Sequence, residues 1–448
     1  MADTPDAPDD PLVGAWDPTM QAGRRVHPLL RGLGLLGVMV LVAATAAATT
    51  GVLLVQRAEA SLTRVPVGQL DEVDDDVTGV PTARSFLVVG SDARDGLSEE
   101  DLGELTLGSP GAFGGQRADT MIYVSVSADR ETISLVSLPR DLLVRDHRDR
   151  PAKLTDTFAG GPDALIEVVQ SNFGLPVNHY ASVSLNGFIE VVRTLGGVEI
   201  CLEDPLVDPK SGADFEAGCQ QMDARDSLAY VRSRRGPRAD FERIDRQQRF
   251  IQSVVGDLVS ARRLADPVQL FQLVDDVASN VETDEALTLN EMRRHADEAR
   301  RVVADGFPMT TVPAYNQRID GLEFMVAYGP GARALFEDLR EGRPIADRGS
   351  REERGETVIA TWSGGRGEAN SIVSRTLSFA GFLPGGAGRG PEGTDAGGTT
   401  VVYEVPGRSE QAGWVAATLG AEVLPLPAGV DAPPDADVVV AVGDDATS

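Results

Sequence analysis

Apolar residues between positions 86 and 202 recur in two patterns, as short β-rich runs and as stretches with helical spacing. The short runs predict strands over 86–90, 121–127, 132–138, 180–184 and 198–202. Helical spacing predicts helices over 163–172 and 187–195, and a glycine follows each of them. Strands and helices mixed in this order predict a layered α/β domain.

A longer amphipathic stretch follows at 241–264. Its apolar positions share one helix face, and they are Ile244, Ile251, Val255 and Leu258. Asp240 stands where an N-cap residue is expected. Weaker helical patterns continue to residue 340, so we place one large domain at 85–340.

The last part of the chain is predicted to form a second, smaller unit. Residues 341–356 are highly charged and predict a linker, and residues 357–448 predict a small C-terminal α/β domain. The expected elements of this domain are a strand at its start, a helix over 369–380 and strands over 400–405 and 438–442. The glycine-rich stretch 385–398 predicts a loop.

The N-terminal region contains one long uncharged stretch. Residues 32–55 carry no charge over 24 positions, and at ~1.5 Å rise per residue such a helix crosses a ~30 Å hydrocarbon core. The alternative is a cleaved signal peptide, whose apolar region has only ~7–15 residues. The preceding Arg24, Arg25 and Arg31 favour an N-terminus inside the cell.

We therefore expect a single-pass protein of the cell membrane. Its predicted parts are a disordered cytoplasmic tail at 1–31, a transmembrane helix at 32–55 and an extracellular stalk at 56–84. The two domains that follow are then expected outside the cell.

Composition excludes some classes of protein. The chain has 41 Lys and Arg against 69 Asp and Glu, a formal net charge of −28. Nucleic-acid binding needs a basic surface, so no nucleic-acid partner is expected. Four His and two Cys exclude a zinc-ribbon or iron–sulfur protein.

The two cysteines are Cys201 and Cys219, and both fall in the region placed outside the cell, where thiols oxidise. We expect a disulfide between them, with both cysteines flanking a Pro/Gly/Asp loop rather than lying in a strand core. The alternative is a pair of buried free thiols.

Charged residues cluster at the predicted boundaries of strands and helices. These charged residues are Asp92, Arg117, Asp119, Arg140, Lys153, Arg232, Arg234 and Arg243, and Gln247 shares a helix face with Arg243. Arginine grips phosphate oxygens two at a time, and aspartate oxygens suit Mg²⁺, which shares its shell with substrate phosphate. The pattern favours a phosphate-rich ligand. The alternative for each arginine is a solvated charge or a structural ion pair.

The segments that carry these residues resemble the motifs of the LytR-CpsA-Psr family of cell-envelope phosphotransferases. They are, in the family's order, FLVVGSDAR, RADTM, SLPRDLLV, KLTDTF, LAYVRSR and DFERIDRQQ. Residues 357–443 resemble the accessory domain called LytR_C, although Trp362-Ser363-Gly364 stands where that domain usually has an Asn-Gly pair.

The resemblance implies a three-layer α/β/α catalytic domain with a mostly mixed central sheet. It also implies a phosphotransferase, dependent on Mg²⁺ (or Mn²⁺), that moves a glycan-phosphate from a polyprenyl-pyrophosphate carrier to peptidoglycan. Its partners would be that lipid-linked glycan, peptidoglycan and the membrane.

The resemblance also assigns roles to single residues. Asp92 and Asp119 are similar to the family's metal ligands, and Arg117, Asp119 and Arg140 are expected to act in catalysis. The implied pyrophosphate-binding residues are Arg117, Arg140, Lys153, Arg232, Arg234, Arg243 and Gln247. Arg94 and Asp141 lie in the same motifs and are expected to brace the site.

Two other functions stay open at this point. A hydrolase of the polyprenyl pyrophosphate would use the same residues with water as the acceptor. A non-enzymatic wall-binding or regulatory protein, as an older transcriptional-attenuator label for the family suggests, would need none of this chemistry. No motif residue lies in 357–448, so we expect this domain to be separable from catalysis.

Overall fold

The computed structural model describes residues 62–71, 83–93, 117–236, 240–258, 281–288, 291–292, 294–295, 302 and 307–447. The predicted cytoplasmic tail and the predicted transmembrane helix at 32–55 lie outside these residues. No helix within the described stretches is both long and apolar enough to cross a membrane.

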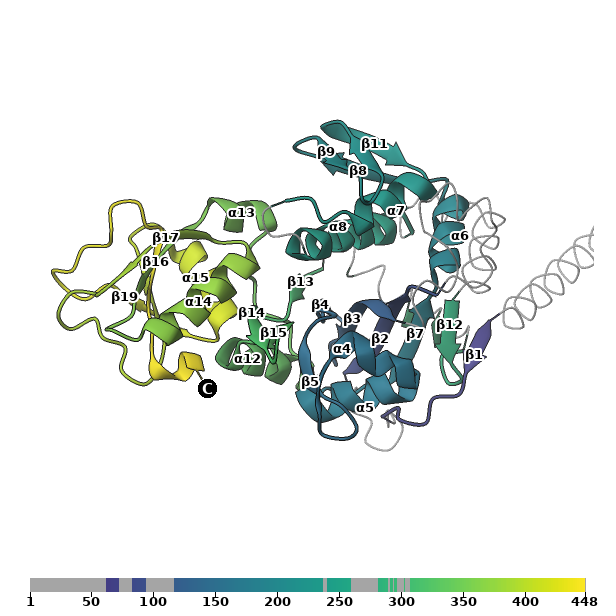
Figure 1. The fold of residues 1–448 in the computed structure, drawn as a ribbon, viewed down its shortest axis with the longest axis horizontal. Coiled ribbons are helices and arrows are strands. Elements are labelled where there is room, and N and C mark those ends of the chain that lie inside the picture. The colour runs from purple at the N-terminus through teal and green to yellow at the C-terminus, as the bar shows by residue number, and fades with distance from the viewer. Residues whose placement is uncertain are drawn as a thin grey trace, which may run out of the picture. The chain divides into compact units, whose positions relative to one another are not determined.

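A mixed seven-stranded sheet organises the larger domain (Figure 1). Its strands in spatial order are β1 (Thr63–Val65), β12 (Val281–Asp284), β7 (His179–Val183), β2 (Arg84–Ser91), β3 (Ala118–Val126), β4 (Ile133–Ser137) and β13 (Met309–Thr311). At its centre β3 runs antiparallel to both β2 and β4, and the flanking pairs β2–β7 and β4–β13 are parallel. The predicted mixed sheet is confirmed.

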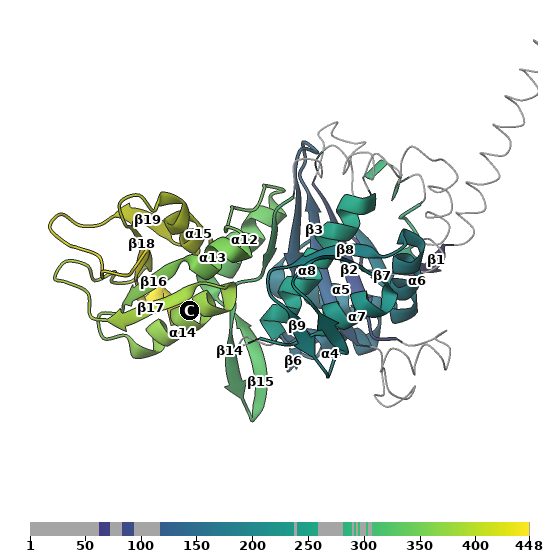
Figure 2. The same ribbon diagram turned by 90° about the horizontal axis from the view of Figure 1, so that it is seen from above.

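Helices cover both faces of this sheet. On one face, Leu87 and Tyr123 share a core with α5 (Pro162–Phe173) and α12 (Gly329–Arg340). On the other face, Phe86 and Ile122 pack with residues of α8 (Asp240–Leu258). Neighbouring strand residues point to opposite faces, which is why the pairs 86/87 and 122/123 divide between two cores. Figure 2 shows α8 and α5 beside the strands, and the α/β/α layering is confirmed for the described residues.

Local signals set the ends of the helices. Helix α5 starts with Pro162 and ends at Gly174, whose φ of 64° suits glycine. Helix α6 (Leu185–Leu195) starts after Ser184, whose hydroxyl accepts a hydrogen bond from the Gly187 amide. These ends agree with the predicted helices to within about two residues, the usual uncertainty of a helix boundary.

Part of the predicted stalk belongs to the domain instead. Strand β1 pairs in parallel with β12 at the edge of the sheet. Asp71 is also engaged, because its carboxylate accepts from the Val177 amide at 2.8 Å and its own amide donates to the Val177 carbonyl at 2.8 Å. Residues 62–71 are therefore packed rather than extended into solvent.

A small lobe with its own core contains the disulfide. Two antiparallel pairs, β8 (Val198–Leu202) with β11 (Gly218–Met222) and β9 (Leu206–Asp208) with β10 (Ala213–Phe215), pack with α6 and α7 (Ala224–Arg232). Cys201 stands directly opposite Cys219, and the predicted disulfide joins them. Cys201 is the last but one residue of β8 and Cys219 the second of β11, and both lie on the exposed side of the pleat rather than in a strand core.

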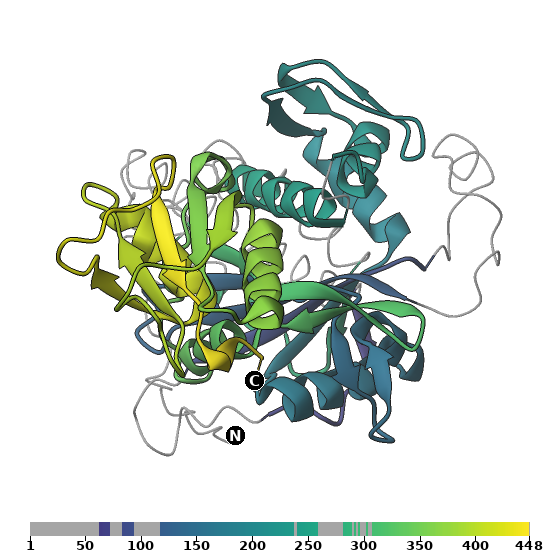
Figure 3. The same ribbon diagram turned by 60° about the vertical axis from the view of Figure 1, so that its left-hand side comes forward.

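The C-terminal domain has a five-stranded sheet, coloured yellow-green to yellow in Figure 3. In spatial order its strands are β17 (Leu383–Gly388), β16 (Val358–Trp362), β20 (Val438–Ala441), β18 (Val401–Glu404) and β19 (Glu422–Pro425). Helices α14 (Gly367–Ala380) and α15 (Ser409–Leu419) share its core. A small α/β domain was predicted here, and the structure has one.

Two details of this region differ from the prediction. The glycine-rich stretch starts inside strand β17, where Gly385 lies so close to β16 that an added Cβ would be 2.6 Å from Val358 Cγ1. A side chain is excluded there, so glycine marks a close strand contact rather than a loop. The charged linker contains helix α13 (Arg351–Glu356), which begins with a capping box between Ser350 and Glu353.

Candidate functional site

Three predicted site residues meet at one edge of the central sheet. Asp92 follows β2, Asp119 is the second residue of β3, and Arg140 follows β4 closely. Because β3 is antiparallel to its neighbours, its first residues lie beside the last residues of β2 and β4. Arg140 Nη1 accordingly lies 2.7 Å from Asp119 Oδ1.

Asp92 is held by the start of β3. Its Oδ1 accepts from the Arg117 amide at 2.9 Å, and its own amide donates to the Arg117 carbonyl at 3.0 Å. The register between β2 and β3 shifts between Gly90 and Ser91. Such a bulge turns the following residues away from the regular ladder. Asp92 is therefore fixed through the backbone of Arg117, whose side chain is on the exposed surface.

Arg140 is also held through Asp141, which joins it to Lys153. Lys153 Nζ donates to Asp141 Oδ1 at 2.8 Å, and Arg140 Nε lies 3.4 Å from Asp141 Oδ2. Burial raises the pKa of Asp141, but the hydrogen bond from Lys153 and the charge of Arg140 outweigh it, so the pKa is lowered below its ordinary value. The sequence suggested that Asp141 braces the site, and these contacts are what such a brace requires.

The backbone of Arg140 is fixed as well. Its carbonyl accepts from the Thr155 amide at 2.9 Å, at the start of α4 (Leu154–Thr157). Lys153 ends β6 (Pro151–Lys153) directly before that helix. The KLTDTF segment therefore supports Arg140 both through a side chain and through the backbone.

Helix α8 supplies the opposite wall of a small hollow at this edge. The residues that line it are Asp119, Thr120, Met121, Ile122, Ser137, Leu138, Pro139, Arg140, Arg243, Ile244, Gln247, Gln248 and Ile251. Four predicted site residues are thus brought together, two from the sheet and two from α8. Arg243 is only 6% exposed, so its charge is held in a largely water-excluded place.

Gln248 was not singled out from the sequence, and it fixes α8 against the sheet. Its Nε2 lies 2.9 Å from Ser137 Oγ and 3.1 Å from Thr311 Oγ1. These contacts join α8 to the last residues of β4 and β13. The sequence feature that could have identified Gln248 is its position next to Gln247 in the DFERIDRQQ segment.

Four predicted binding residues are not among the described residues that line the hollow, and they are Arg117, Lys153, Arg232 and Arg234. Arg232 and Arg234 flank Ser233 at the end of α7. Asp208 accepts from Ser233 Oγ at 2.9 Å and from the Arg234 amide at 3.0 Å. Arg246 of α8 donates to the Ser233 carbonyl at 3.0 Å. These contacts hold the segment firmly. Its two arginines form a second basic group, which is not part of the described lining of the hollow. Arg94 lies outside the described residues.

The acidic residues suit a hard cation. Within the stretches that the structure describes, no three or more His, Cys, Asp or Glu side chains form a group that could hold a metal. Mg²⁺ is usually held by one or two carboxylates together with substrate phosphates and water. Asp92, directly after β2, and Asp119, in the neighbouring β3, are two carboxylates of the kind that such a partial set of oxygen ligands needs.

Comparison with known proteins identifies the class. The sequence profile of the LytR_cpsA_psr family matches residues 56–341. The chain therefore belongs to the LytR_cpsA_psr family, as its motifs suggested. The C-terminal domain lies beyond the matched residues, so its likeness to LytR_C stays a prediction.

Several curated proteins are similar to this chain. "Probable cell wall biosynthesis protein LcpB" of Corynebacterium glutamicum is 31% identical over 258 residues, which cover 57% of this chain and 61% of the relative. "Cell wall biosynthesis protein LcpA" of the same bacterium is 30% identical over 310 residues, 60% of this chain and 58% of the relative. "Polyisoprenyl-teichoic acid--peptidoglycan teichoic acid transferase TagU" of Bacillus subtilis is 30% identical over 211 residues, 46% of this chain and 61% of the relative. The chain thus spans less than two thirds of the length of these relatives.

One solved structure is the "LytR-Csp2A-Psr enzyme from Actinomyces oris", with 21% sequence identity and a TM-score of 0.49. The alignment covers 62% of this chain and 96% of that chain.

Proposed function

We propose that this protein is a membrane-anchored phosphotransferase that moves a glycan-phosphate from a polyprenyl-pyrophosphate carrier to peptidoglycan. The observation that carries the proposal is the hollow in which Arg140 and Asp119 of the sheet face Arg243 and Gln247 of α8. The name of the TagU relative, a transferase between a polyisoprenyl-linked polymer and peptidoglycan, supports this reaction class.

In this reaction a hydroxyl of the acceptor attacks the phosphorus that carries the glycan. A new O–P bond forms, the P–O bond to the second phosphate breaks, and the lipid phosphate leaves with the electron pair. The guanidinium groups of Arg140 and Arg243 would neutralise the charge that moves onto the leaving phosphate. Asp119 would orient the guanidinium of Arg140, whose planar fork of N–H donors matches phosphate oxygens.

The proton of the acceptor hydroxyl must pass to a base or to water. Asp119 is the only carboxylate among the described residues that line the hollow. Asp119 and Asp92 would hold Mg²⁺ (or Mn²⁺), which when bound neutralises phosphate charge. Asp119 therefore serves as candidate base and as candidate metal ligand.

A membrane anchor at 32–55 with its N-terminus inside the cell completes the proposal, and it places the reaction outside the cell. Protease added to intact protoplasts should then remove most of the chain. Protection of the bulk of the chain would contradict this topology. A LytR_C-like C-terminal domain and the absence of a nucleic-acid partner remain parts of the same proposal.

The test is transfer of a lipid-linked glycan to purified peptidoglycan by the full-length protein in detergent. A covalently linked glycan is the expected product, and it requires both the acceptor and Arg140. Release of free glycan-phosphate, with or without acceptor, would favour the pyrophosphate hydrolase. Binding to peptidoglycan without either product would favour the wall-binding protein.

A further inference from the structure

Helix α8 brings Arg243 and Gln247 to the hollow, and its first turns rest on the segment that follows the larger domain. Arg351, the first residue of α13, forms ion pairs with Glu242 and Asp245 of α8. Its Nε lies 3.1 Å from Asp245 Oδ2. The two carboxylates flank Arg243 in the sequence, so one arginine of the linker holds the turn that presents the buried arginine of the site.

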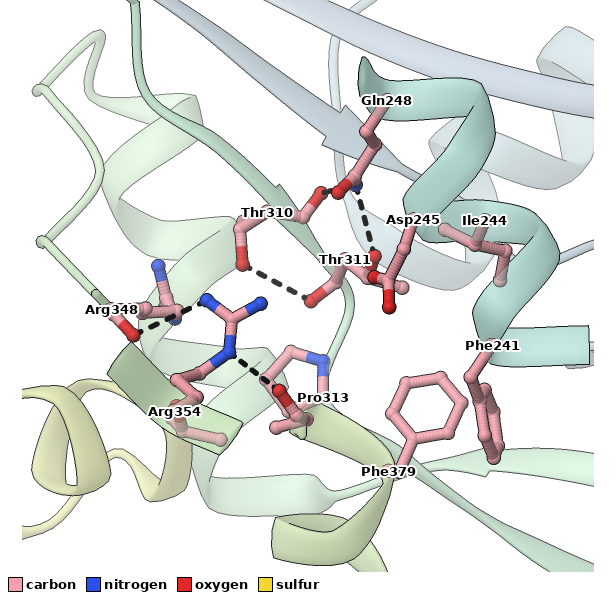
Figure 4. A pocket seen from close by; sticks show the side chains of 12 residues that line it. Phe241, Ile244, Asp245, Gln248, Thr310, Thr311, Pro313, Arg348, Arg354 and Phe379 are labelled. Atoms are coloured by element: carbon pink, nitrogen blue, oxygen red, sulfur yellow. Dashed lines mark hydrogen bonds between the residues drawn. The ribbon is translucent and has the colours of Figure 1, made fainter. Parts of the chain in front are cut away.

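The same turn contacts the C-terminal domain. Phe241 meets Phe379 of α14 edge to face, with 3.7 Å between the ring centroids. Phe379 is buried and belongs to the core cluster of the central sheet. Figure 4 shows the two rings together, with Ile244, Asp245 and Gln248 along the same helix. This contact argues against the separability of residues 357–448 that the sequence suggested.

A second pocket lies beside these contacts, and Phe241, Asp245 and Phe379 are among the residues that line it. It is lined by residues of α8, by Thr310 and Thr311, and by residues of the linker and C-terminal domain. Ile244 and Gln248 line both this pocket and the hollow that contains Arg140. They form the wall between the two, so a shift of the first turns of α8 changes the hollow directly.

The charge of Glu242 makes the arrangement sensitive. This residue is 4% exposed, and a buried carboxylate is costly unless it is paired. Removal of Arg351 would leave the carboxylate with weaker compensation, and movement of the turn toward water would relieve it. Such a movement displaces the neighbouring Arg243.

We propose that Arg351 is a positioning residue, which couples the linker and C-terminal domain to Arg243 and Gln247 of the site. This inference rests on the proposed function, since Arg243 and Gln247 matter only if the hollow binds a phosphate-bearing substrate. A displacement of about 1 Å at a reacting group can cost roughly 10²-fold in rate. The C-terminal domain is then part of the support of the site.

The experiment compares full-length variants at position 351 with a matched arginine of the same linker. Arg351→Met keeps the apolar stem and removes the charge, and Arg351→Lys restores the charge. Arg343→Met is the control, because the ion pairs of Arg343 are with Glu337, Asp338 and Glu341 rather than with α8. We expect Arg351→Met to lower kcat/KM for the lipid-linked donor about 10- to 100-fold, and Arg351→Lys to recover part of it.

A second change separates the charge effect from simple loss of packing. Glu242→Gln in the Arg351→Met background removes the charge of the buried carboxylate, so it should recover much of the lost activity. Hydrogen exchange of the amides in α8 should be faster in Arg351→Met than in wild type and unchanged in Arg343→Met. Folded Arg351→Met with wild-type kcat, KM and exchange would overturn the proposal, and so would faster exchange without a kinetic change.

The proposed function and the positioning role of Arg351 can be tested independently of each other. If wild-type protein transfers no glycan, the proposed function is wrong, and binding of geranyl pyrophosphate measured by calorimetry replaces kinetics. Weaker binding by Arg351→Met than by Arg343→Met would then still support the positioning role. Equal binding by the two variants would refute it.

Discussion

Arg140 Nη1 lies 2.7 Å from Asp119 Oδ1, and this pair joins the end of β4 to the start of β3. The two side chains are 22% and 45% exposed, so the pair is open to solvent on one side. An exposed ion pair of this kind contributes little to stability. Its value lies in orientation, because the carboxylates of Asp119 and Asp141 fix the plane of the guanidinium, whose planar fork matches phosphate oxygens.

Replacement of Arg140 should therefore affect transfer much more than folding. Arg140→Ala removes donors to the shifting charge and should slow transfer by about 10²–10³-fold. Arg140→Lys keeps the charge but loses the planar fork, so it should also be strongly impaired. Transfer of lipid-linked glycan to peptidoglycan measures the effect, with circular dichroism to confirm the fold.

Arg148→Ala is the matched control for Arg140, because Arg148 is an exposed arginine in the turn between β5 (Leu143–Arg145) and β6. It should transfer at the wild-type rate. Wild-type rates in folded Arg140→Ala would contradict a role for this residue in phosphate binding.

Asp119→Asn should remove both the charge that orients Arg140 and an oxygen ligand suited to Mg²⁺. We expect chelation to reduce wild-type transfer and added Mg²⁺ to restore it, whereas Asp119→Asn should stay slow at all Mg²⁺ concentrations. The expected loss is about 10²-fold or more, equivalent to several kcal/mol of transition-state stabilisation.

Asp149→Asn provides the comparison for Asp119, since Asp149 is 87% exposed and its ion pair with Arg145 is long, at 3.8 Å. It should respond to Mg²⁺ as the wild type does. If chelation leaves wild-type transfer unchanged, the metal part of the proposal is wrong.

The sequence predicted the centre of the site better than its surroundings. Asp119 and Arg140 follow from local pattern, because one lies at the start of a strand and the other shortly after a strand, and both strands have a clear apolar run. Contacts between distant segments have no such local signal. The three residues of β1 pair with β12 more than 200 positions later, so they were assigned to a stalk. Arg351 in the charged linker gave no indication that it reaches α8.

The local sequence pattern also could not predict where the side chains of a segment lie relative to the site. Arg232 and Arg234 were grouped with the phosphate-binding residues because they lie in the family motif LAYVRSR. Asp208 of the small lobe holds Ser233 and the Arg234 amide, so the position of that lobe decides where this segment lies. Spacing along the chain does not determine that position.

Asp141 should make the stability of the domain depend on acid pH. Burial raises its pKa, but the contacts with Lys153 and Arg140 outweigh burial, so the pKa lies below its ordinary value of 3.8. A carboxyl group whose pKa is lower in the folded than in the unfolded state stabilises the fold at pH values above its unfolded-state pKa. This stabilisation is lost as the pH falls through the folded-state pKa. The difference in free energy of unfolding between wild type and Asp141→Asn should therefore be constant down to about pH 5 and shrink below about pH 4.

Denaturant unfolding at several pH values measures this difference, with Asp149→Asn as the exposed control. The control should differ little from wild type at any pH. A wild-type advantage over Asp141→Asn that persists unchanged at pH 2 would show that the ionised carboxylate does not provide the stabilisation.

The disulfide should stabilise the small lobe that holds Ser233 and Arg234. Cys201 and Cys219 are 18 residues apart, and closure of such a loop is worth ~3 kcal/mol in the chain-entropy model. A Cys201→Ser/Cys219→Ser variant should lose about that much free energy of unfolding and be cleaved sooner by protease within 198–222. Reduced wild type should behave like the variant, and reductant should not affect the variant further. Two alkylatable thiols in unreduced, denatured wild type would show that the bond is absent from the protein.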